Sequence, residues 1–331
     1  MSKRVKIAGM NLFLASFLFL ACEKEVNDSS PAARDFRQDM REFVGALSDY
    51  GRARKADFII IPQNGQELVT LNGEADGESA AAYINAIDGV GREDLFYGYY
   101  RDNQATPAED LSYMLKFLDL CEQNGVQVLT TDYCSSHDKM DDSFQKNAAR
   151  GYISFAAPRR GLDIIPDYPK TPFNVNDQNV TALAEARNFL YLINPEKFAS
   201  KSAFISALAQ TDYDVIIMDC FFNEQILSAA EIASLKIKKN GGVRLVISYL
   251  SIGEAEEYRY YWNSAWKKNP PAWLEEENPD WPGNFKVRYW DESWQKIIYG
   301  GPDTYLDKII NAQFDGVYLD IIDAFEYFEN K

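Results

Sequence analysis

Short apolar runs recur along the chain, and turn-forming residues bound each of them. Eight such runs are present, as expected for strands that are covered on both faces. They lie at residues 58–61, 86–91, 126–131, 152–156, 189–193, 215–218, 245–250 and 316–319. Segments with helical spacing of apolar residues separate them, for example 34–55, 111–118 and 226–235. Eight strands alternating with helices predict a (β/α)8 TIM-type barrel, and the alternative is an open doubly wound sheet.

The charge and the reactive side chains of the chain limit its chemistry. Asp and Glu number 50 against 34 Lys and Arg, so the net charge is −16. This excess argues against nucleic acid as a partner and suits a neutral or cationic substrate. The single His argues against a His-based metal site or triad. The three cysteines after residue 100 lack CxxC spacing and predict buried thiols rather than zinc ligands: Cys121, Cys134 and Cys220.

The N-terminus has the pattern of a targeting segment. A basic start precedes an apolar run from Met10 to Ala21, which is too short to cross a bilayer as a stable helix. The run ends Phe-Leu-Ala-Cys, which resembles a bacterial lipobox with Cys22 as the acylated residue. We therefore expect a lipoprotein signal peptide at residues 1–21 and a polar tether at 22–33. The alternative is an ordinary secretory signal followed by an incidental Cys.

Polar side chains follow most of the predicted strands. In a barrel of this type the site is built from the carboxyl ends of the strands and the loops after them. Carboxylates occur at five of the eight ends. One such acid alone is more often a solvated loop residue or a helix cap. Together, and with 14% aromatic residues, they suit glycoside hydrolysis. The side chains selected by this criterion include Gln63, Asn64, Glu93, Asp94, Asp132, Tyr133, Asp219, Tyr249, Ser251, Glu254, Glu256, Asp320 and Asp323.

Several longer motifs carry a family resemblance. They are YLSIGEAE at 249–256, YRYYW at 258–262, NPDWPGN at 278–284, VRYWD at 287–291, FDGVYLDIID at 314–323, IPQNG at 61–65 and GREDLFY at 91–97. Together they resemble the endo-α-1,4-polygalactosaminidase-like glycoside hydrolases, family 114 and relatives. The resemblance covers roughly residues 57–160 and 189–328. It implies a barrel that hydrolyses an amino-sugar polysaccharide without a cofactor.

The order of these motifs differs from the order in the family. There, the segment that resembles residues 189–193 comes first, and the counterparts of 61–65 and 91–97 follow the counterpart of 314–323. The two halves are exchanged in this chain. This arrangement predicts a circular permutation whose joint lies at 163–188, a Pro- and Asn-rich stretch. Barrel termini lie close together, so a cut at another loop is physically tolerable.

The resemblance also implies which residues react. The family's catalytic acids correspond to Asp320 at the end of FDGVYLD and to Glu93 in GREDLF. We expect Asp320 to be the nucleophile and Glu93 to be the acid/base, at the rims of strands two apart. Nine residues are expected to bind substrate: Gln63, Asn64, Asp132, Tyr133, Asp219, Tyr249, Glu254, Trp290 and Asp323. Arg259 is interpreted as a structural ion-pair partner of Glu256, three positions before it.

The sequence leaves three classes of function open. The first is a lipid-anchored glycoside hydrolase of the bacterial cell envelope, monomeric and free of metal, formed by one barrel domain at 34–331 and anchored most simply to the outer membrane. The second is a carbohydrate-binding lipoprotein on the same barrel without turnover. The third, a metal-dependent hydrolase, has less support because the oxygen-only ligands would favour Mg²⁺ or Ca²⁺ and no EF-hand-like loop is present.

Overall fold

All eight predicted apolar runs form parallel strands in the computed structural model, which describes residues 34–331. The predicted signal peptide, the tether and Cys22 lie outside the described residues. The boundaries differ most at the run 86–91, which begins at the last residue of α2 and whose strand starts only at Gly89. The strands are β1 (Ile59–Pro62), β2 (Gly89–Glu93), β3 (Gln127–Tyr133), β4 (Ile153–Ala157), β5 (Phe189–Leu192), β6 (Val215–Met218), β9 (Leu245–Ser251) and β13 (Gly316–Asp320).

These strands belong to two parallel sheets. One has the order β1-β13-β9-β6-β5 and the other the order β2-β3-β4. Single parallel bridges link them, Gln63 to Gly91 on one side and Ser154 to Asn188 on the other. Read through these bridges, the strands follow one another in chain order around the core. A continuous ladder that closes the barrel is not found in residues 34–331, so the barrel prediction is confirmed only as an α/β fold with a central parallel sheet.

The seam between β1 and β2 has a local cause. Two hydrogen bonds join Ile60 to Asp88, the residue just before β2. The Asp88 N–H donates to the Ile60 carbonyl (2.9 Å), and the Ile60 N–H donates to the Asp88 carboxylate (2.8 Å). The Asp88 carboxylate therefore occupies the Ile60 N–H, a donor that a continuous β1–β2 ladder would bond to a backbone carbonyl. Pro62 ends β1 and has no N–H to donate.

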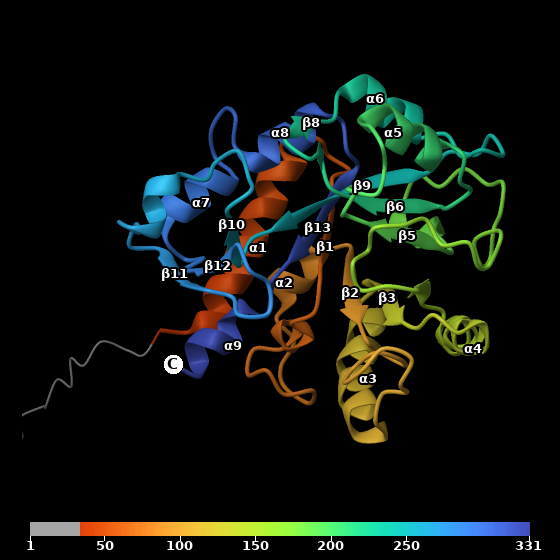
Figure 1. Cartoon of the computed structure of the whole chain (residues 1–331). Helices are drawn as coiled ribbons and strands as arrows, with labels where there is room; N and C mark the ends of the chain where they lie inside the picture. Colours follow the sequence, from red (N-terminus) through yellow and green to blue (C-terminus); the bar gives the residue numbers. More distant parts are fainter. Residues whose placement is uncertain (1–33) are drawn as a thin grey trace, which may run out of the picture. The chain divides into compact units, whose positions relative to one another are not determined.

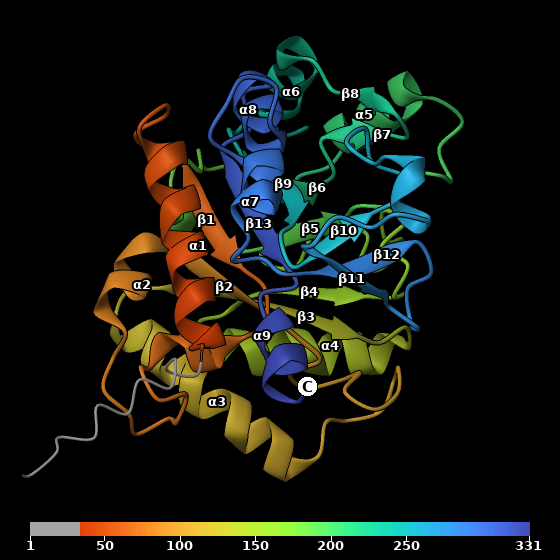
Figure 2. The same ribbon diagram turned by 90° about the vertical axis from the view of Figure 1, so that its left-hand side faces the viewer.

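Helices lie around the outside of the strands, as the two views show (Figures 1 and 2). In Figure 2, α3 and α4 lie along the sheet of β2, β3 and β4, and α1 lies beside β1. The helices are α1 (Phe36–Arg52), α2 (Ala81–Ala86), α3 (Ala108–Gln123), α4 (His137–Ala148), α5 (Lys201–Ala209), α6 (Ala229–Leu235), α7 (Glu292–Ile298), α8 (Tyr305–Asn311) and α9 (Ala324–Glu329). Short 3-10 turns are η1 (Gln66–Val69), η2 (Leu183–Glu185) and η3 (Ser264–Lys267).

Helix α1 follows from its sequence. Asp35 caps its N-terminus by accepting a hydrogen bond from the Gln38 N–H at 2.9 Å. Its apolar residues share one face and are buried: Met40, Phe43, Val44 and Leu47.

No helix among the described residues is both long and apolar enough to span a membrane. Residues Asp35–Lys331 form one compact unit.

The long segment between β9 and the end of α7, called the excursion below, contains a small antiparallel sheet. Its order is β10-β12-β11, formed by β10 (Glu254–Glu256), β12 (Asn284–Val287) and β11 (Leu274–Glu277). A short hairpin, β7 (Phe221–Phe222) with β8 (Gln225–Ile226), follows β6. Four of the six Trp side chains of this region pack on one another: Trp262, Trp266, Trp273 and Trp294. Most of the tryptophan content therefore stabilises the excursion.

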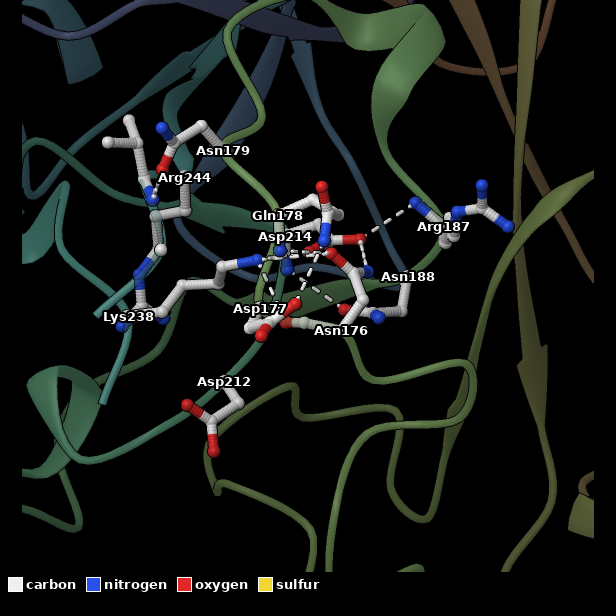
Figure 3. A network of polar contacts seen from close by, with 12 residues as sticks. Asn176, Asp177, Gln178, Asn179, Arg187, Asn188, Asp212, Asp214, Lys238 and Arg244 are labelled. Atoms are coloured by element: carbon white, nitrogen blue, oxygen red, sulfur yellow. Dashed lines mark hydrogen bonds and ion pairs between the residues drawn. The ribbon is translucent and has the colours of Figure 1, made fainter. Parts of the chain in front are cut away.

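The later part of the segment at 163–188 lies at the amino-terminal ends of β5 and β6, and a buried polar network holds it there (Figure 3). The fully buried Lys238 ammonium lies 2.9 Å from Oδ1 of the fully buried Asp214, and it also donates to the Asn176 carbonyl at 3.0 Å. The other Asp214 oxygen accepts from the Asn176 amide and the Arg187 N–H, both at 2.9 Å. The predicted loop is therefore fixed by a buried charge pair.

Gly91 illustrates how closely the strands approach inside the core. A Cβ at this position would lie 2.0 Å from the Tyr318 hydroxyl oxygen of β13. We expect Gly91→Ala to lower the free energy of unfolding by about 1–3 kcal/mol, because Tyr318 must move. Chemical denaturation measures this loss. Gly45→Ala in α1, where nothing lies within 4 Å, is the control and should not destabilise the protein. An equal effect of both changes would contradict the packing argument.

Candidate active site

A cavity of about 460 Å³ lies at the carboxyl ends of the central strands. It combines residues that are far apart in the sequence, from the loop after β1 to the loop after β13. Nine of the eleven residues that the sequence predicts for catalysis or substrate binding line it: Gln63, Asn64, Glu93, Tyr133, Asp219, Tyr249, Glu254, Asp320 and Asp323.

Asp320 ends β13 and has both carboxylate oxygens in hydrogen bonds. The Tyr249 hydroxyl donates to Oδ2 at 2.7 Å, and the Ile321 N–H donates to Oδ1 at 2.9 Å. Burial raises the pKa of Asp320 to about 7; the Tyr249 hydrogen bond opposes this shift, and the negative charge of Glu93 adds to it. Asp320 therefore changes its protonation state near neutral pH.

Glu93 ends β2, which is separated from β13 only by β1 through the Gln63–Gly91 bridge. The Tyr133 hydroxyl of β3 donates to its Oε1, and the Asn64 amide donates to Oε2 at 3.5 Å. Glu93 is half-buried and lines the same cavity as Asp320. The two acids predicted to react therefore lie on strands two apart and contribute to one cavity.

Three residues beside these site residues have left-handed backbone conformations. They are Asn64, Asp94 and Ile321, with φ of 59°, 59° and 60°. Asp94 and Ile321 directly follow the two acids. A β-branched residue such as Ile321 is strongly disfavoured at positive φ. Strain of this kind costs of order 1–3 kcal/mol per residue and is concentrated at functional sites. The backbone is bent sharply at the ends of β1, β2 and β13, immediately beside the cavity.

An ion-pair cluster forms another part of the wall. The Arg259 guanidinium contacts Glu256 through Nε and Asp219 through Nη1, the latter at 2.6 Å. The Glu256 contact confirms the ion pair predicted from their spacing. Burial raises the pKa of Asp219 despite the nearby positive charge of Arg259. Arg259 is thus already neutralised by two carboxylates that line the cavity.

Glu254 is a cavity carboxylate with one buried oxygen that lacks a partner. Its Oε1 accepts a hydrogen bond from the Asn278 amide at 2.7 Å, whereas its buried Oε2 has no hydrogen-bond partner. Burial raises the pKa of Glu254, and the Asn278 hydrogen bond opposes this shift. A buried carboxylate oxygen without a partner is costly unless a bound group supplies a donor.

The cavity has a strong excess of negative groups. Seven carboxyl side chains line it, against two guanidinium groups. Arg259 is paired with Glu256 and Asp219, and Arg160 is paired with Asp94 and Asp102. Among residues 34–331, Glu93, Glu254 and Asp320 have no ion-pair partner. Such a cavity attracts a cationic ligand more than a neutral one and repels an anion.

Two predicted substrate contacts are not in the cavity. Asp132 is fully buried and accepts hydrogen bonds from the Phe96 and Tyr97 N–H groups, the Ser143 hydroxyl and the Asn147 amide. It holds the loop after β2, and no capacity is left for a ligand. Trp290 packs against three aromatic rings, those of Phe36, Tyr289 and Phe328. Neither side chain lines the cavity, because Asp132 is enclosed in the protein interior and the half-buried Trp290 packs on other rings.

The structure adds cavity residues that the sequence reasoning did not select. Tyr191 of β5 donates to the Gln63 Oε1 at 2.8 Å and orients that amide. Arg160 lies over the Tyr133 ring, 4.2 Å from its centre. Trp281 belongs to the NPDWPGN motif, and its position between turn residues is the signal in the sequence for an exposed ring. The added residues include Arg160, Tyr191, Tyr258, Trp281 and Asn284.

Cysteine thiols and carboxyl groups are side chains that could bind a metal ion. Cys121, Cys134 and Cys220 are buried free thiols, as predicted. No group of three or more His, Cys, Asp or Glu side chains suited to hold a metal ion is found in the described part of the chain.

The cavity offers the carboxyl groups of Asp320 and Glu93, hydroxyl donors from Tyr249 and Tyr133, and further carboxylates in its wall. Two carboxyl groups across a sugar-sized cavity are what glycoside hydrolysis requires.

Comparison with known proteins finds a family model that matches the second part of this chain. Residues 176–331 match the model of glycoside-hydrolase family GH114. The GH114 region begins inside the segment before β5 and extends to the end of the chain. It includes Asp219, Tyr249, Glu254, Asp320 and Asp323, whereas Glu93 and its neighbours precede it. The match covers less than half of the chain.

Several curated proteins are similar to part of the chain. An uncharacterized protein of Methanocaldococcus jannaschii is 41% identical over 155 residues, which is 46% of this chain and 42% of that protein. An uncharacterized protein of Deinococcus radiodurans is 41% identical over 127 residues, 38% of this chain and 39% of that protein. One of Thermotoga maritima is 47% identical over 97 residues, 29% and 28% respectively. The chain thus spans less than half the length of these relatives.

Proposed function

We propose that this protein is a glycoside hydrolase that cleaves an amino-sugar polysaccharide between the carboxyl groups of Asp320 and Glu93. The observation that carries the proposal is that both acids line one cavity, from strands two apart. The GH114 match, which includes Asp320, supports the reaction class.

In the proposed reaction Asp320 is the nucleophile. Its carboxylate attacks the anomeric carbon while the Glu93 carboxylic acid protonates the departing glycosidic oxygen. Glu93 then removes a proton from the water that breaks the glycosyl–Asp320 ester. The Tyr249 hydroxyl and the Ile321 N–H both donate to Asp320, and such donors stabilise its ionised form. This double-displacement scheme retains the anomeric configuration.

We further propose that the substrate carries free amino groups, as an α-1,4-linked galactosamine polymer does. The excess of carboxylates in the cavity supports a cationic sugar. Glu254 is the proposed partner of the ammonium group, because its Oε2 has no hydrogen-bond partner. Asp219 is less suited, since Arg259 already occupies one of its oxygens.

The test of this function is a screen of the purified protein with its signal peptide removed. An α-1,4-galactosamine polymer should be shortened to oligosaccharides that mass analysis detects, and the fully N-acetylated polymer should be a poorer substrate. Binding of the polymer without any product would favour the non-catalytic carbohydrate-binding alternative. Neither binding nor cleavage would contradict the proposed substrate class.

The raised pKa of Asp320 predicts the acid side of the pH profile. A nucleophile must be ionised, and Asp320 loses its proton only as the pH rises through about 7. We therefore expect kcat/KM to fall about tenfold for each pH unit below 7, because this ratio reports the free enzyme. Tyr249→Phe removes a donor to the carboxylate and should move this limb to higher pH.

A second buried acid, Asp323, would give the same fall of kcat/KM below pH 7 if its protonation controlled the rate. Burial also raises the pKa of Asp323 to about 7, and Asp323 lines the same cavity. Asp323→Asn should retain the limb if Asp320 controls it. A rate that instead rises as the pH falls through 7 would make Asp320 the general acid and would reverse the two assigned roles.

We also propose that the chain is circularly permuted relative to its family. The GH114 match begins at residue 176, inside the predicted joint, and the relatives match only part of their own lengths. Both facts are expected if the first half of this chain corresponds to a segment that follows the match elsewhere. A relative in which the counterpart of β2 follows the counterpart of β13 would establish the permutation.

The proposed location rests on the N-terminal sequence. We propose that Cys22 is acylated and anchors the enzyme in the bacterial cell envelope, most simply at the outer membrane. Mass spectrometry of the N-terminal peptide tests this. A diacylglyceryl-modified Cys22 is expected, and an unmodified N-terminus after residue 21 would contradict the anchor.

A further inference from the structure

Two aromatic rings at the cavity are unusually exposed. Trp281 is 57% exposed and Tyr258 is 59% exposed, and both line the cavity. Four of the other tryptophans pack on one another, and Trp290 packs on neighbouring rings. Core packing therefore does not account for Trp281. Exposed aromatic side chains around a polar cavity are a feature of ligand-binding surfaces.

The two rings come from adjacent stretches of backbone. Strands β10 and β12 pair Glu256 with Asn284, and the Glu257 N–H donates to the Gly283 carbonyl at 2.8 Å. Tyr258 lies just after β10, and the turn that carries Trp281 lies just before β12. The two residues are therefore at the same end of this antiparallel pair. In Figure 2, β10, β11 and β12 lie together as one small sheet.

Local contacts hold the Tyr258 ring and the backbone that carries Trp281 in place without burying either ring. The Tyr258 hydroxyl donates to the Glu256 Oε1 at 2.6 Å, and the Arg259 guanidinium lies 5.1 Å from the centre of its ring. The Trp281 N–H of the backbone donates to the Asn278 carbonyl at 3.2 Å, and the Trp281 carbonyl accepts from the Asn284 N–H at 3.0 Å. A ring or turn that is fixed in advance loses less conformational entropy when a ligand stacks on it.

The same turn is tied to the acidic wall. Asn278, at the start of the turn, donates to the Glu254 Oε1 at 2.7 Å. A sugar unit bound at Glu254 therefore has the Trp281 turn beside it. The ring faces are electron-rich, and they attract both the C–H face of a sugar and a nearby ammonium group.

We propose that Trp281 and Tyr258 form a stacking subsite at the cavity mouth that binds a sugar unit of the polymer away from the bond that is cleaved. This inference rests on the proposed function and deepens it, since a subsite beyond the cleavage point favours long chains over short ones. Its contribution falls on substrate binding, because neither ring contacts Asp320 or Glu93 in the described hydrogen bonds.

The experiment measures binding and turnover with the galactosamine polymer and a short galactosamine oligosaccharide. In the full mature chain we expect Trp281→Ala to weaken the affinity of an Asp320→Asn background for the polymer roughly tenfold, the effect of one aromatic contact. In the active enzyme the loss should appear in KM for the polymer and be smaller for the short oligosaccharide. Trp281→Phe should restore most of the affinity.

The control is another exposed aromatic residue. Tyr100 is 70% exposed and does not line the cavity, so Tyr100→Ala should leave polymer affinity unchanged. If the parent enzyme cleaves the polymer and Trp281→Ala binds it as tightly as the parent, the subsite is refuted while the proposed function stands. If the parent neither binds nor cleaves the polymer, the proposed function fails, and the subsite fails for this polymer with it.

Discussion

Asp320→Asn is expected to lower the rate of hydrolysis by roughly 10²–10⁴-fold while the thermal midpoint hardly changes. Asn has nearly the same shape and retains an acceptor for the Tyr249 hydroxyl, which lies 2.7 Å from the Asp320 carboxylate. It has no negative charge with which to attack a sugar. The measurement is product formation from the galactosamine polymer together with a melting curve.

Glu93→Gln should have an effect of similar size, since an amide cannot transfer the proton that the leaving oxygen needs. The Tyr133 and Asn64 contacts show that the Glu93 carboxylate is held in position from two sides. The matched control is Glu292→Gln on α7, because this side chain is 84% exposed and lies outside the cavity. Full activity in Asp320→Asn or in Glu93→Gln would refute the assignment of that residue.

Asp214→Asn is expected to lower the free energy of unfolding by about 3–5 kcal/mol, because it leaves the buried Lys238 ammonium without its counter-charge. Both side chains are fully buried and lie 2.9 Å apart (Figure 3). The network lies at the amino-terminal ends of the strands, away from the cavity. Denaturant-induced unfolding measures the loss.

Two variants make this stability test specific. Glu292→Gln breaks the exposed Lys296–Glu292 pair, whose side chains are 72% and 84% exposed, and should cost no more than about 1 kcal/mol. The double variant Asp214→Asn with Lys238→Met removes both charges and should recover part of the loss. A loss of stability in Asp214→Asn no larger than in Glu292→Gln would show that the buried pair does not brace the 163–188 segment.

The acids of the cavity and the structural acids could not be separated by sequence reasoning alone. Asp132 and Asp219 both follow apolar strands and carry the same side chain. Only Asp219 lines the cavity, whereas Asp132 is enclosed by four donors from α4 and the loop between β2 and α3. The donors Ser143 and Asn147 come from the next helix, and their approach to Asp132 depends on how that helix packs.

Tryptophan shows the same limit. Trp290 and Trp281 stand nine positions apart in one excursion, and both lie among aromatic and turn residues. Trp290 packs on Phe36 of α1, from the opposite end of the chain, and so is removed from the cavity. Trp281 has only Pro and Gly after it in its turn, and its ring stays exposed.

Local sequence alone determined the eight strands, the helix at 36–52 and the placing of polar groups directly after the strands, because apolar runs, helical spacing and caps act over a few neighbouring residues. Tertiary structure alone decided which of those polar groups share one cavity and that Asp320 titrates near pH 7. Both depend on burial and on charges contributed by strands more than 200 residues apart, and neither quantity exists until the sheets have come together.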